Sequence, residues 1–484
     1  MISIMKFLSK INKGTYAGLF ICFFFFIAYL TLSLIRHSHF LSGYDLAIVS
    51  QYTWEYSNFK NAISTISTYA FTPAFYDHIE FIYIFLSPFY WFFHDARILL
   101  VLQSLFVAVS GIPVFLLMKK YKINLLLSLA LLISYFSFYG IQNAIWADVH
   151  SLVFAASFLA FFIYFLDKGY RWGTLLFFFL AITSKEDIAI LTFLIAFSHF
   201  VFTRKKMDLV LMLVSLVYFY AAFFLWFPSL PLANRDIVKN GFLSNMNLLN
   251  FVNTGDKRQV ILYSLSWYGF LPLLSPVFLL PFLGDLSHYF IFGEVAERAQ
   301  SIFMHYRVTL SILLIWPTIL AISKFRFLNK KILALYILFF AVWLTYLLHA
   351  PLTYLTKKWF WTEPAAVKNI NNILRYLPVS APVVSQNNIT PHISERYSIF
   401  TLWPEKKTFV INSPCGKHTC DWFRWAGKPE YLIVDTSSDW DIRHFLANRP
   451  DFVAGLKNME TAGVIKKYKE EGNSVLYKIG KNPN

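Results

Sequence analysis

Cysteine and charged residues are both scarce in this sequence. Its 484 residues include only three cysteines, and 14% of the residues are charged, with 27 acidic against 43 basic side chains. Three cysteines are too few to form a disulfide framework that would stabilise a chain of this length. So few charges, together with 57% hydrophobic and 20% aromatic residues, exclude a chain that is soluble throughout. The composition therefore predicts a polytopic membrane protein.

Acidic residues are too few to balance the basic ones, and the formal net charge is +16. Such an excess can indicate nucleic-acid binding. Here, however, the basic residues fall in short clusters at the ends of apolar runs, as expected for cytoplasmic anchors that face anionic lipid. We therefore expect membrane lipids as a partner and no nucleic acid.

The N-terminal region lacks a small-residue cleavage site before Arg36. Lys6, Lys10 and Lys13 precede an apolar run over 16–35, which is long enough to span a bilayer. The run therefore predicts an uncleaved signal anchor. Because flanking lysines stay in the cytoplasm, we expect a cytoplasmic N-terminus.

Apolar runs that alternate with basic clusters predict about eleven crossings. Each Lys and Arg cluster marks a cytoplasmic end, and a span needs roughly 20 apolar residues to cross a hydrocarbon core of about 30 Å. The run over 172–184 is shorter, so we expect the residues that follow it to lie at or below the outer surface. The expected spans are 16–35, 98–118, 125–142, 152–166, 172–184, the run ending at Phe202, 209–227, a broken hairpin within 260–292, 308–322 and 333–348.

Two segments of the first outer loop are expected to be interfacial helices. One covers 79–93, which is short and interrupted by Pro88. The other covers 42–56, where apolar residues recur at helical spacing, and it places Asp45 where lipid meets water. The alternative for Asp45 is that it only N-caps this helix. The expected apolar face is Leu46, Val49, Thr53 and Tyr56, with Ser50, Gln51 and Glu55 pointing away.

The last part of the chain has shorter apolar runs. We expect a transmembrane domain over 1–356 and a small extracytoplasmic α/β domain over 357–484. The sequence has no internal repeat, low-complexity tract or Gly/Ser-rich linker. Strands are expected at 382–384, 408–411, 431–434 and 475–479, and helices at 364–376 and 441–447.

The motif CGKHTC contains Cys415, His418 and Cys420. Zinc binding would need a fourth ligand, and none is evident. A disulfide is favoured in an oxidising compartment, and a pair of free thiols remains the alternative.

The predicted topology brings ionisable residues from five parts of the chain to one membrane face. Such groups at the ends of spans are costly unless they pair or line a wet cavity, which makes them functional candidates. The alternative is that they are ordinary interfacial residues. The aromatic residues Tyr44, Tyr52, Trp54 and Trp146 either stack on sugars or form an interfacial belt. The ionisable set is Asp45, Asp77, His78, Asp148, His150, Lys185, Glu186, Asp187 and His305, with Tyr306 beside them.

One reaction needs this combination of groups. Transfer of a sugar from a lipid-linked phosphate to a hydroxyl requires a base for the acceptor, a cation for the departing phosphate and an apolar groove for the lipid. Asp45 on a surface helix can accept the hydroxyl proton. Lys185 near bilayer depth can neutralise the leaving phosphate.

The same residues carry a resemblance. The order GYDLAIVSQ, DHIEFIYIFLSPFYWFF, LLVLQSLFVAVSGIPVFLL, WADVHSL, SKEDIAILT, FMHYR and PHISER, roughly over 32–404, resembles a bacterial polytopic membrane family catalogued as domain of unknown function 2079. That family is assigned to the GT-C type glycosyltransferases, like the aminoarabinose transferases and protein O-mannosyltransferases. The resemblance implies a GT-C-like α-helical polytopic membrane protein with a small α/β domain, in a bacterial inner membrane.

The resemblance also implies residue roles. The catalytic acid of the first outer loop corresponds to Asp45, and the phosphate-contacting lysine of the KED element corresponds to Lys185. His78 matches the His of an HFSP-like element but is followed by Ile79 and Glu80. An FDFHPE-like element keeps Asp148 and His150 but has Ser151 and Leu152 where Pro and Glu are expected. Glu186, Asp187, His305 and Tyr306 would line the site, and the PHLS-R-like element is Pro391, His392, Ile393, Ser394 and Arg396.

A divalent metal is a possible cofactor, because Asp45 with Asp148 or Asp187 offers hard oxygen ligands. The first loop lacks a DxD pair, so we favour metal independence. The hypothesis is an inverting glycosyltransferase that moves a sugar from a polyprenyl phosphate to an envelope glycan, lipid or protein. A transporter of lipid-linked sugars would instead need polar residues at mid-span. A non-enzymatic assembly subunit would tolerate replacement of Asp45.

Overall fold

The computed structural model describes residues 13–66, 71–75, 78–229, 247–291, 299–325, 329–403, 423–437 and 449–480. The chain divides into two compact units. We call the first the helical unit, which comprises Met1–Ser33, Phe75–Ile82 and Val101–Thr356. The second, the α/β unit, comprises Leu34–Ala74, Tyr83–Leu100 and Lys357–Asn484.

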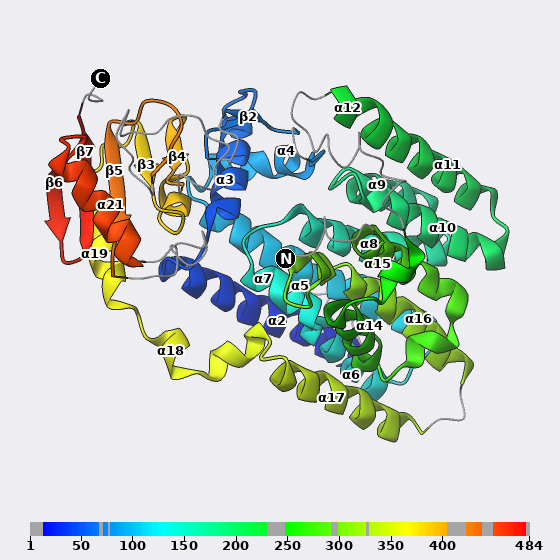
Figure 1. Ribbon diagram of the computed structural model, residues 1–484. Helices are drawn as coiled ribbons and strands as arrows, with labels where there is room; N and C mark the ends of the chain where they lie inside the picture. The colour runs from blue at the N-terminus through cyan, green and yellow to red at the C-terminus, as the bar shows by residue number, and fades with distance from the viewer. Residues whose placement is uncertain are drawn as a thin grey trace, which may run out of the picture. The chain divides into compact units, whose positions relative to one another are not determined.

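Several helices of the described chain are long and apolar enough to cross a membrane. Six meet this condition by length and composition, or seven if one bent pair is a single span. They coincide with runs in which the sequence predicts spans. In Figure 1 they are α2 (Lys13–Ser38), α5 (Arg97–Lys120), α8 (Ser151–Lys168), the continuous run Lys206–Ser229 that begins with α11 (Lys206–Tyr220) and ends with α12 (Phe227–Ser229), His305–Lys324 with α16 (Leu310–Lys324), α17 (Lys330–Leu347), and the bent pair α6 (Leu125–Ser137) with α7 (Tyr139–Trp146).

Two helices of the helical unit are apolar but short. α9 (Arg171–Ile182) has 12 residues and α10 (Ile188–Thr203) has 16. At about 1.5 Å per residue, α9 is about 18 Å long, well short of a hydrocarbon core of about 30 Å. The turn between these helices carries Lys185, Glu186 and Asp187.

The segment expected to be a broken hairpin is interrupted by prolines. α14 (Gly255–Trp267) is followed by the short 3-10 turns η4 (Leu271–Leu274) and η5 (Pro276–Leu279), and then by α15 (Leu280–Phe290). Proline lacks a backbone N–H and clashes with the preceding helical turn, so the helix cannot continue through this segment. α15 packs against α10 and α16 and carries polar groups toward the turn after α9.

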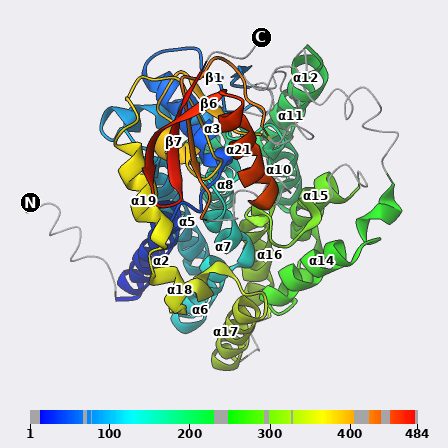
Figure 2. The same ribbon diagram turned by 60° about the vertical axis from the view of Figure 1, so that its left-hand side comes forward.

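The α/β unit contains a five-stranded sheet in the order β4-β3-β5-β7-β6 (Figure 1). Figure 2 shows β6 and β7 of this sheet from a second direction. β3 (Val383–Ser385) is parallel to β4 (Ile399–Thr401) and to β5 (Tyr431–Asp435). β7 (Ser474–Ile479) is antiparallel to β5 and forms a hairpin with β6 (Ile465–Glu471). The strands at 382–384, 431–434 and 475–479 thus have counterparts in the sheet, whereas β4 and β6 were not predicted.

Alternating side chains of the strands pack into two apolar layers, one on each face of the sheet. Val383, Ile433 and Leu476 pack with α19 (Ala365–Leu374), and their neighbours Val384, Leu432 and Val475 pack with α21 (Arg449–Thr461). This is the period-two pattern of a sheet that is covered on both faces. The expected strand at 408–411, the expected helix at 441–447, and Cys415, His418 and Cys420 lie outside the described residues.

Most of the segment between α2 and α5 belongs to the α/β unit. α3 (Tyr44–Ser57) is a helix, as predicted, and Phe40 and Ala47 share an apolar cluster with α19 and the sheet. The sequence-based boundary at 356/357 coincides with one limit between the units, but the loop residues 34–74 and 83–100 group with the tail. Of the second expected interfacial helix, 79–93, the structure contains α4 (Ile82–Leu86) and η1 (Ser87–Trp91).

The polar residues of α3 were predicted to point away from its apolar face, as in a helix on a membrane surface, but the structure buries them in the α/β unit. Ser50, Gln51 and Glu55 are buried. Ser50 donates to the Glu395 carboxylate at 3.0 Å, and the Gln51 side-chain amide donates to the Arg396 carbonyl at 2.8 Å. The PHISER segment thus supplies the partners that make burial of this face tolerable.

The N-cap alternative for Asp45 is also wrong. The N-cap of α3 is Gly43, which makes no side-chain capping bond, and Asp45 stands in the first turn with its side chain exposed. A carboxylate there interacts favourably with the helix dipole, but it does not close the helix end.

Candidate functional site

The turn between α9 and α10 places three charged side chains inside the helical unit. Lys185, Glu186 and Asp187 are 6%, 4% and 6% exposed. The short helix α9 ends at Ile182. The hydroxyls of the next two residues, Thr183 and Ser184, donate hydrogen bonds to backbone carbonyls in the last turn of α9. Charges buried to this degree are costly unless each has a partner, so the partners define the site.

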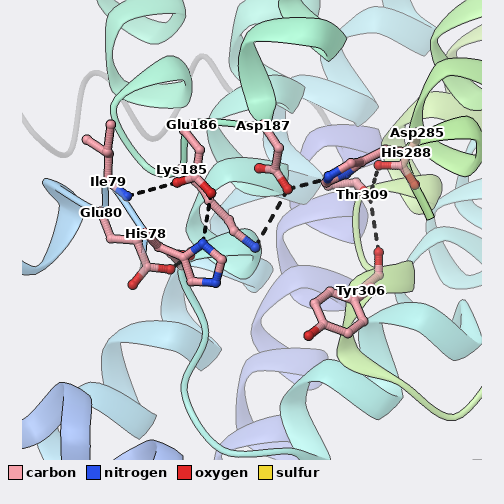
Figure 3. Close-up of polar contacts among 11 residues, drawn as sticks. His78, Ile79, Glu80, Lys185, Glu186, Asp187, Asp285, His288, Tyr306 and Thr309 are labelled. Carbon is pink, nitrogen blue, oxygen red and sulfur yellow. Dashed lines mark hydrogen bonds and ion pairs between the residues drawn. The ribbon is translucent and has the colours of Figure 1, made fainter. Parts of the chain in front are cut away.

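Glu186 is held by the segment that precedes α4. One carboxylate oxygen lies 2.8 Å from His78 Nδ1, and the other accepts the Ile79 backbone N–H at 2.8 Å (Figure 3). Both oxygens of Glu186 are therefore engaged. The His78 side chain is 45% exposed, so the cluster is open at this histidine.

His78 and Glu186 each stabilise the charged form of the other. Burial and Lys185 both lower the pKa of His78, but Glu186 and Glu80 outweigh them, and the net pKa is raised. Burial raises the pKa of Glu186, yet His78 and Lys185 outweigh burial and the net pKa is lowered. The ion pair therefore persists around neutral pH.

Lys185 has charge partners but few hydrogen bonds. Its Nζ lies 3.6 Å from Asp187 Oδ2, beyond a good hydrogen bond, and 5.7 Å from the centre of the Tyr306 ring. Among the described residues none accepts a hydrogen bond from Nζ within 3.5 Å. Burial lowers the pKa of the ammonium, but Asp187 and Glu186 outweigh it and raise the pKa. The lysine therefore stays charged, with N–H donors directed into the site.

Asp187 connects Lys185 to α15. Its Oδ2 also lies 3.6 Å from His288 Nδ1, while its Oδ1 is buried without a described hydrogen-bond partner. A cavity of about 10 Å³ beside Asp187, Asp285 and His288 has about the room that one water molecule needs. Figure 3 shows Asp285 and His288 on the far side of Asp187 from Lys185, with Thr309 donating to Asp285 at 2.8 Å.

A histidine stack connects two further predicted residues. The rings of His150 and His305 are stacked with centres 3.5 Å apart, and the ring of Tyr306 lies 4.1 Å from that of His305. His150 precedes α8, and its backbone N–H donates to the buried side chain of Gln103 at 3.3 Å. Asp148 is buried beside it. The WADVH and HYR segments therefore meet next to the lysine.

Two of the four departures from the family-like motifs contact each other. Glu80 stands where the resemblance expects Ser, and Ser151 stands where it expects Pro. In the structure Ser151 donates its hydroxyl to the Glu80 carboxylate. Burial raises the pKa of Glu80, although His78 and Lys185 oppose the shift. Sequence reasoning treated Glu80 only as a mismatch, so its role as a site residue was missed.

Other residues of the cluster were also missed by sequence reasoning. Asp285 and His288 lie three residues apart on α15, in the segment that the sequence predicts to be a proline-broken hairpin. Arg307 is fully buried, with its guanidinium 4.9 Å from the Tyr289 ring. The sequence did contain signals for these residues. Asp285 and His288 are an ionisable i, i+3 pair in an apolar segment, and Arg307 is the third residue of the HYR motif.

Asp45 belongs to the α/β unit, and Lys185 belongs to the helical unit. Their convergence in one pocket stays a prediction from topology. Asp77 lies outside the described residues. Within the described part of the chain, no group of three or more His, Cys, Asp or Glu side chains is placed to hold a metal ion.

The helical unit contains groups that can interact with an anion. A charged, buried ammonium with unused donors faces a half-exposed histidine that carries a raised pKa. An oxyanion placed there would receive charge-assisted hydrogen bonds. Asp187 would keep His288 as a second partner if Lys185 turned toward such a ligand.

Comparison with known proteins gives a family. A search of curated proteins finds no match to this chain. A family model described as predicted membrane protein, DUF2079, matches residues 36–437. That match covers α3, the candidate site and most of the α/β unit, and the chain therefore belongs to the DUF2079 family of predicted membrane proteins.

Proposed function

We propose that this protein is an inverting membrane glycosyltransferase of the GT-C type, which takes a sugar from a polyprenyl-phosphate carrier. The acceptor is an envelope glycan, lipid or protein at the outer face of the bacterial inner membrane. The proposal includes about eleven crossings, a cytoplasmic N-terminus and an extracytoplasmic α/β unit.

The observation that carries the proposal is the state of Lys185. It is a buried ammonium whose pKa is raised and whose N–H groups are not used by described acceptors. A site of this kind is suited to a phosphate oxygen, because the cost of keeping the cation dry is offset when an anion arrives. Other helices of the same unit, among them α8 and α16, are apolar and belong to runs of membrane-spanning length, which suits a lipid-linked anion.

The chemistry follows from this assignment. The acceptor hydroxyl oxygen attacks the anomeric carbon of the sugar from the face opposite the phosphate, and its proton passes to the Asp45 carboxylate. The bond between the anomeric carbon and the phosphate oxygen breaks, and its electron pair leaves with the phosphate. Lys185 neutralises the charge that develops on that oxygen. Attack from the opposite face inverts the anomeric configuration.

The test is a transfer assay on membranes with radiolabelled polyprenyl-phosphate sugars. We expect Asp45→Asn and Lys185→Ala each to lose at least about a hundredfold in rate, as is typical when a general base or an oxyanion-stabilising group is removed. Matched controls are Asp95→Asn in the same unit as Asp45, and Lys119→Ala, an exposed lysine at the end of α5. Retained transfer in both test variants would remove the assigned mechanism.

The proposed orientation has its own test. Single cysteines at positions 45 and 120, in a chain whose native cysteines are replaced by serine, would be labelled with an impermeant reagent in intact spheroplasts. We expect labelling at position 45 and protection at position 120. Equal protection of both positions would contradict the orientation.

A further inference from the structure

The α/β unit contains a second pocket that the proposed transfer chemistry does not use. It has a volume of about 520 Å³ and lies beside the C-terminal end of α3. That volume falls in the range of about 300–1,000 Å³ that is typical of small-molecule sites. Its lining comes from two parts of the chain, the first outer loop and the segment after PHISER, and includes Glu55, Lys60, Asn61, Phe71 and Tyr397.

Two aromatic rings of this pocket are exposed. Phe71 is 56% exposed and Tyr397 is 52% exposed. The Tyr397 ring is supported by Trp54, with ring centres 4.7 Å apart, and Phe71 is supported by Phe400 at 6.1 Å. Each ring is thus held by a neighbouring ring and leaves about half of its residue surface exposed, where its apolar atoms can contact a ligand.

The polar groups of the pocket include both donors and acceptors. Glu55 accepts the Ile63 backbone N–H through Oε2 at 2.7 Å, and no described residue donates to its Oε1. Lys60 and Asn61 are exposed and make no ion pair or side-chain hydrogen bond with a described residue. Burial raises the pKa of Glu55 to about 7, so near neutral pH its carboxyl can either donate or accept a hydrogen bond.

This combination discriminates among ligand classes. An anionic headgroup would meet the Glu55 carboxyl, and a cationic one would meet the Lys60 ammonium. A neutral saccharide has hydroxyls that both donate and accept, and its pyranose ring has apolar C–H faces that stack on aromatic rings. It is the ligand class whose groups match the whole lining.

We infer that this pocket is a saccharide-binding site, in which Phe71 and Tyr397 stack on a sugar ring and Glu55, Lys60 and Asn61 bind its hydroxyls. The further assignment of that sugar as part of the acceptor rests on the proposed function. Binding of a saccharide does not rest on it, because none of the five residues belongs to the transfer chemistry.

The experiment is saturation-transfer difference NMR on the purified full-length protein, in a detergent without a sugar headgroup. The probes are glucose, galactose, mannose, N-acetylglucosamine and their trisaccharides maltotriose and chitotriose. We expect saturation transfer to at least one probe. Tyr397→Ala and Phe71→Ala should each weaken its binding by about tenfold, which corresponds to loss of one aromatic stack.

Control variants separate a lost contact from a lost fold. Tyr397→Phe keeps the ring and should bind within about twofold of the wild type. Tyr468→Ala removes a half-exposed tyrosine of β6, outside the pocket, and should bind as the wild type does. Absence of saturation transfer to every probe, or equal binding by Tyr397→Ala and the wild type, would overturn the inference.

The two proposals fail in different ways. Lys185→Ala should lose transfer and retain saccharide binding, because Lys185 is not part of this pocket. Binding without transfer in the wild type would remove the proposed function and leave the saccharide site. Transfer that is unaffected by Tyr397→Ala, in a protein that binds no probe, would remove the saccharide site and leave the function.

Discussion

Gly140→Ala offers a sharp test of how the candidate site is built. Gly140 lies in α7, which packs against the 3-10 turn η7 (His305–Arg307) that carries two predicted site residues. A Cβ at position 140 would lie 2.2 Å from the Arg307 carbonyl oxygen and 2.5 Å from its carbon. Non-bonded carbon atoms prefer about 3.5–4.0 Å, so the backbone of η7 must move by about 1 Å.

The expected cost can be worked from these contacts. Overpacking of a close contact costs about 1–3 kcal/mol, and here the obstacle is backbone rather than a side chain that can rotate. Replacement of glycine by alanine in a helix returns at most about 1 kcal/mol. Because the obstacle is backbone, we take the upper half of that cost and expect a net loss of about 1–2 kcal/mol, together with displacement of Tyr306 from Lys185.

The assay compares two glycines. Gly255 begins α14, and a Cβ added there meets no atom within 4 Å, so Gly255→Ala should leave the protein equally or slightly more stable. Scanning fluorimetry in detergent should give a melting temperature a few degrees lower for Gly140→Ala than for Gly255→Ala. If Gly140→Ala melts with the wild type, α7 and η7 do not approach as described.

Two further predictions concern pH. Because the pKa of His78 is raised and that of Glu186 is lowered, their ion pair stabilises the fold above the ordinary pKa of a glutamate and is lost as pH rises through the raised pKa of His78. Glu186→Gln should therefore lower the melting temperature more at pH 6 than at pH 9, and equal losses would contradict the pairing. The raised pKa of Glu55 means that its ionised form is unfavourable in the fold, so the wild type loses stability as pH rises from about 4.5 to about 7. Glu55→Gln should melt above the wild type at pH 8, with a difference that shrinks at pH 5; a constant difference would show that Glu55 titrates normally.

The sequence predicts where the helices lie better than it predicts which distant residues their side chains contact. Apolar runs with basic ends anticipate α2, α5, α8, α16 and α17, because span length and flanking charge are properties of one segment. The helix α3 was also predicted from its periodicity. Its polar face was not interpreted correctly, because burial of Ser50 and Gln51 depends on PHISER, more than 300 residues away in the chain.

The candidate site shows the same limit. Lys185 was predicted because a short apolar run precedes it, which is a local signal. The pairing of Glu186 with His78 and the contact of Ser151 with Glu80 join segments that are far apart in the sequence. A single sequence contains the residues of such contacts but not the contacts themselves. Asp285 and His288 were missed because the prolines around them obscure the helical period.

The central claim is that the buried ammonium of Lys185 binds a lipid phosphate. The most direct measurement is calorimetric titration of the nanodisc-embedded protein with farnesyl phosphate, with farnesol as the uncharged counterpart. Lys185→Gln removes the charge, and Lys119→Gln removes an exposed lysine as a control.

We predict that Lys185→Gln binds farnesyl phosphate about 10–100-fold more weakly than the wild type, the equivalent of one charge-assisted hydrogen bond. Farnesol should bind equally to both, and Lys119→Gln should match the wild type. Equal affinity of Lys185→Gln and wild-type protein for farnesyl phosphate would contradict the account.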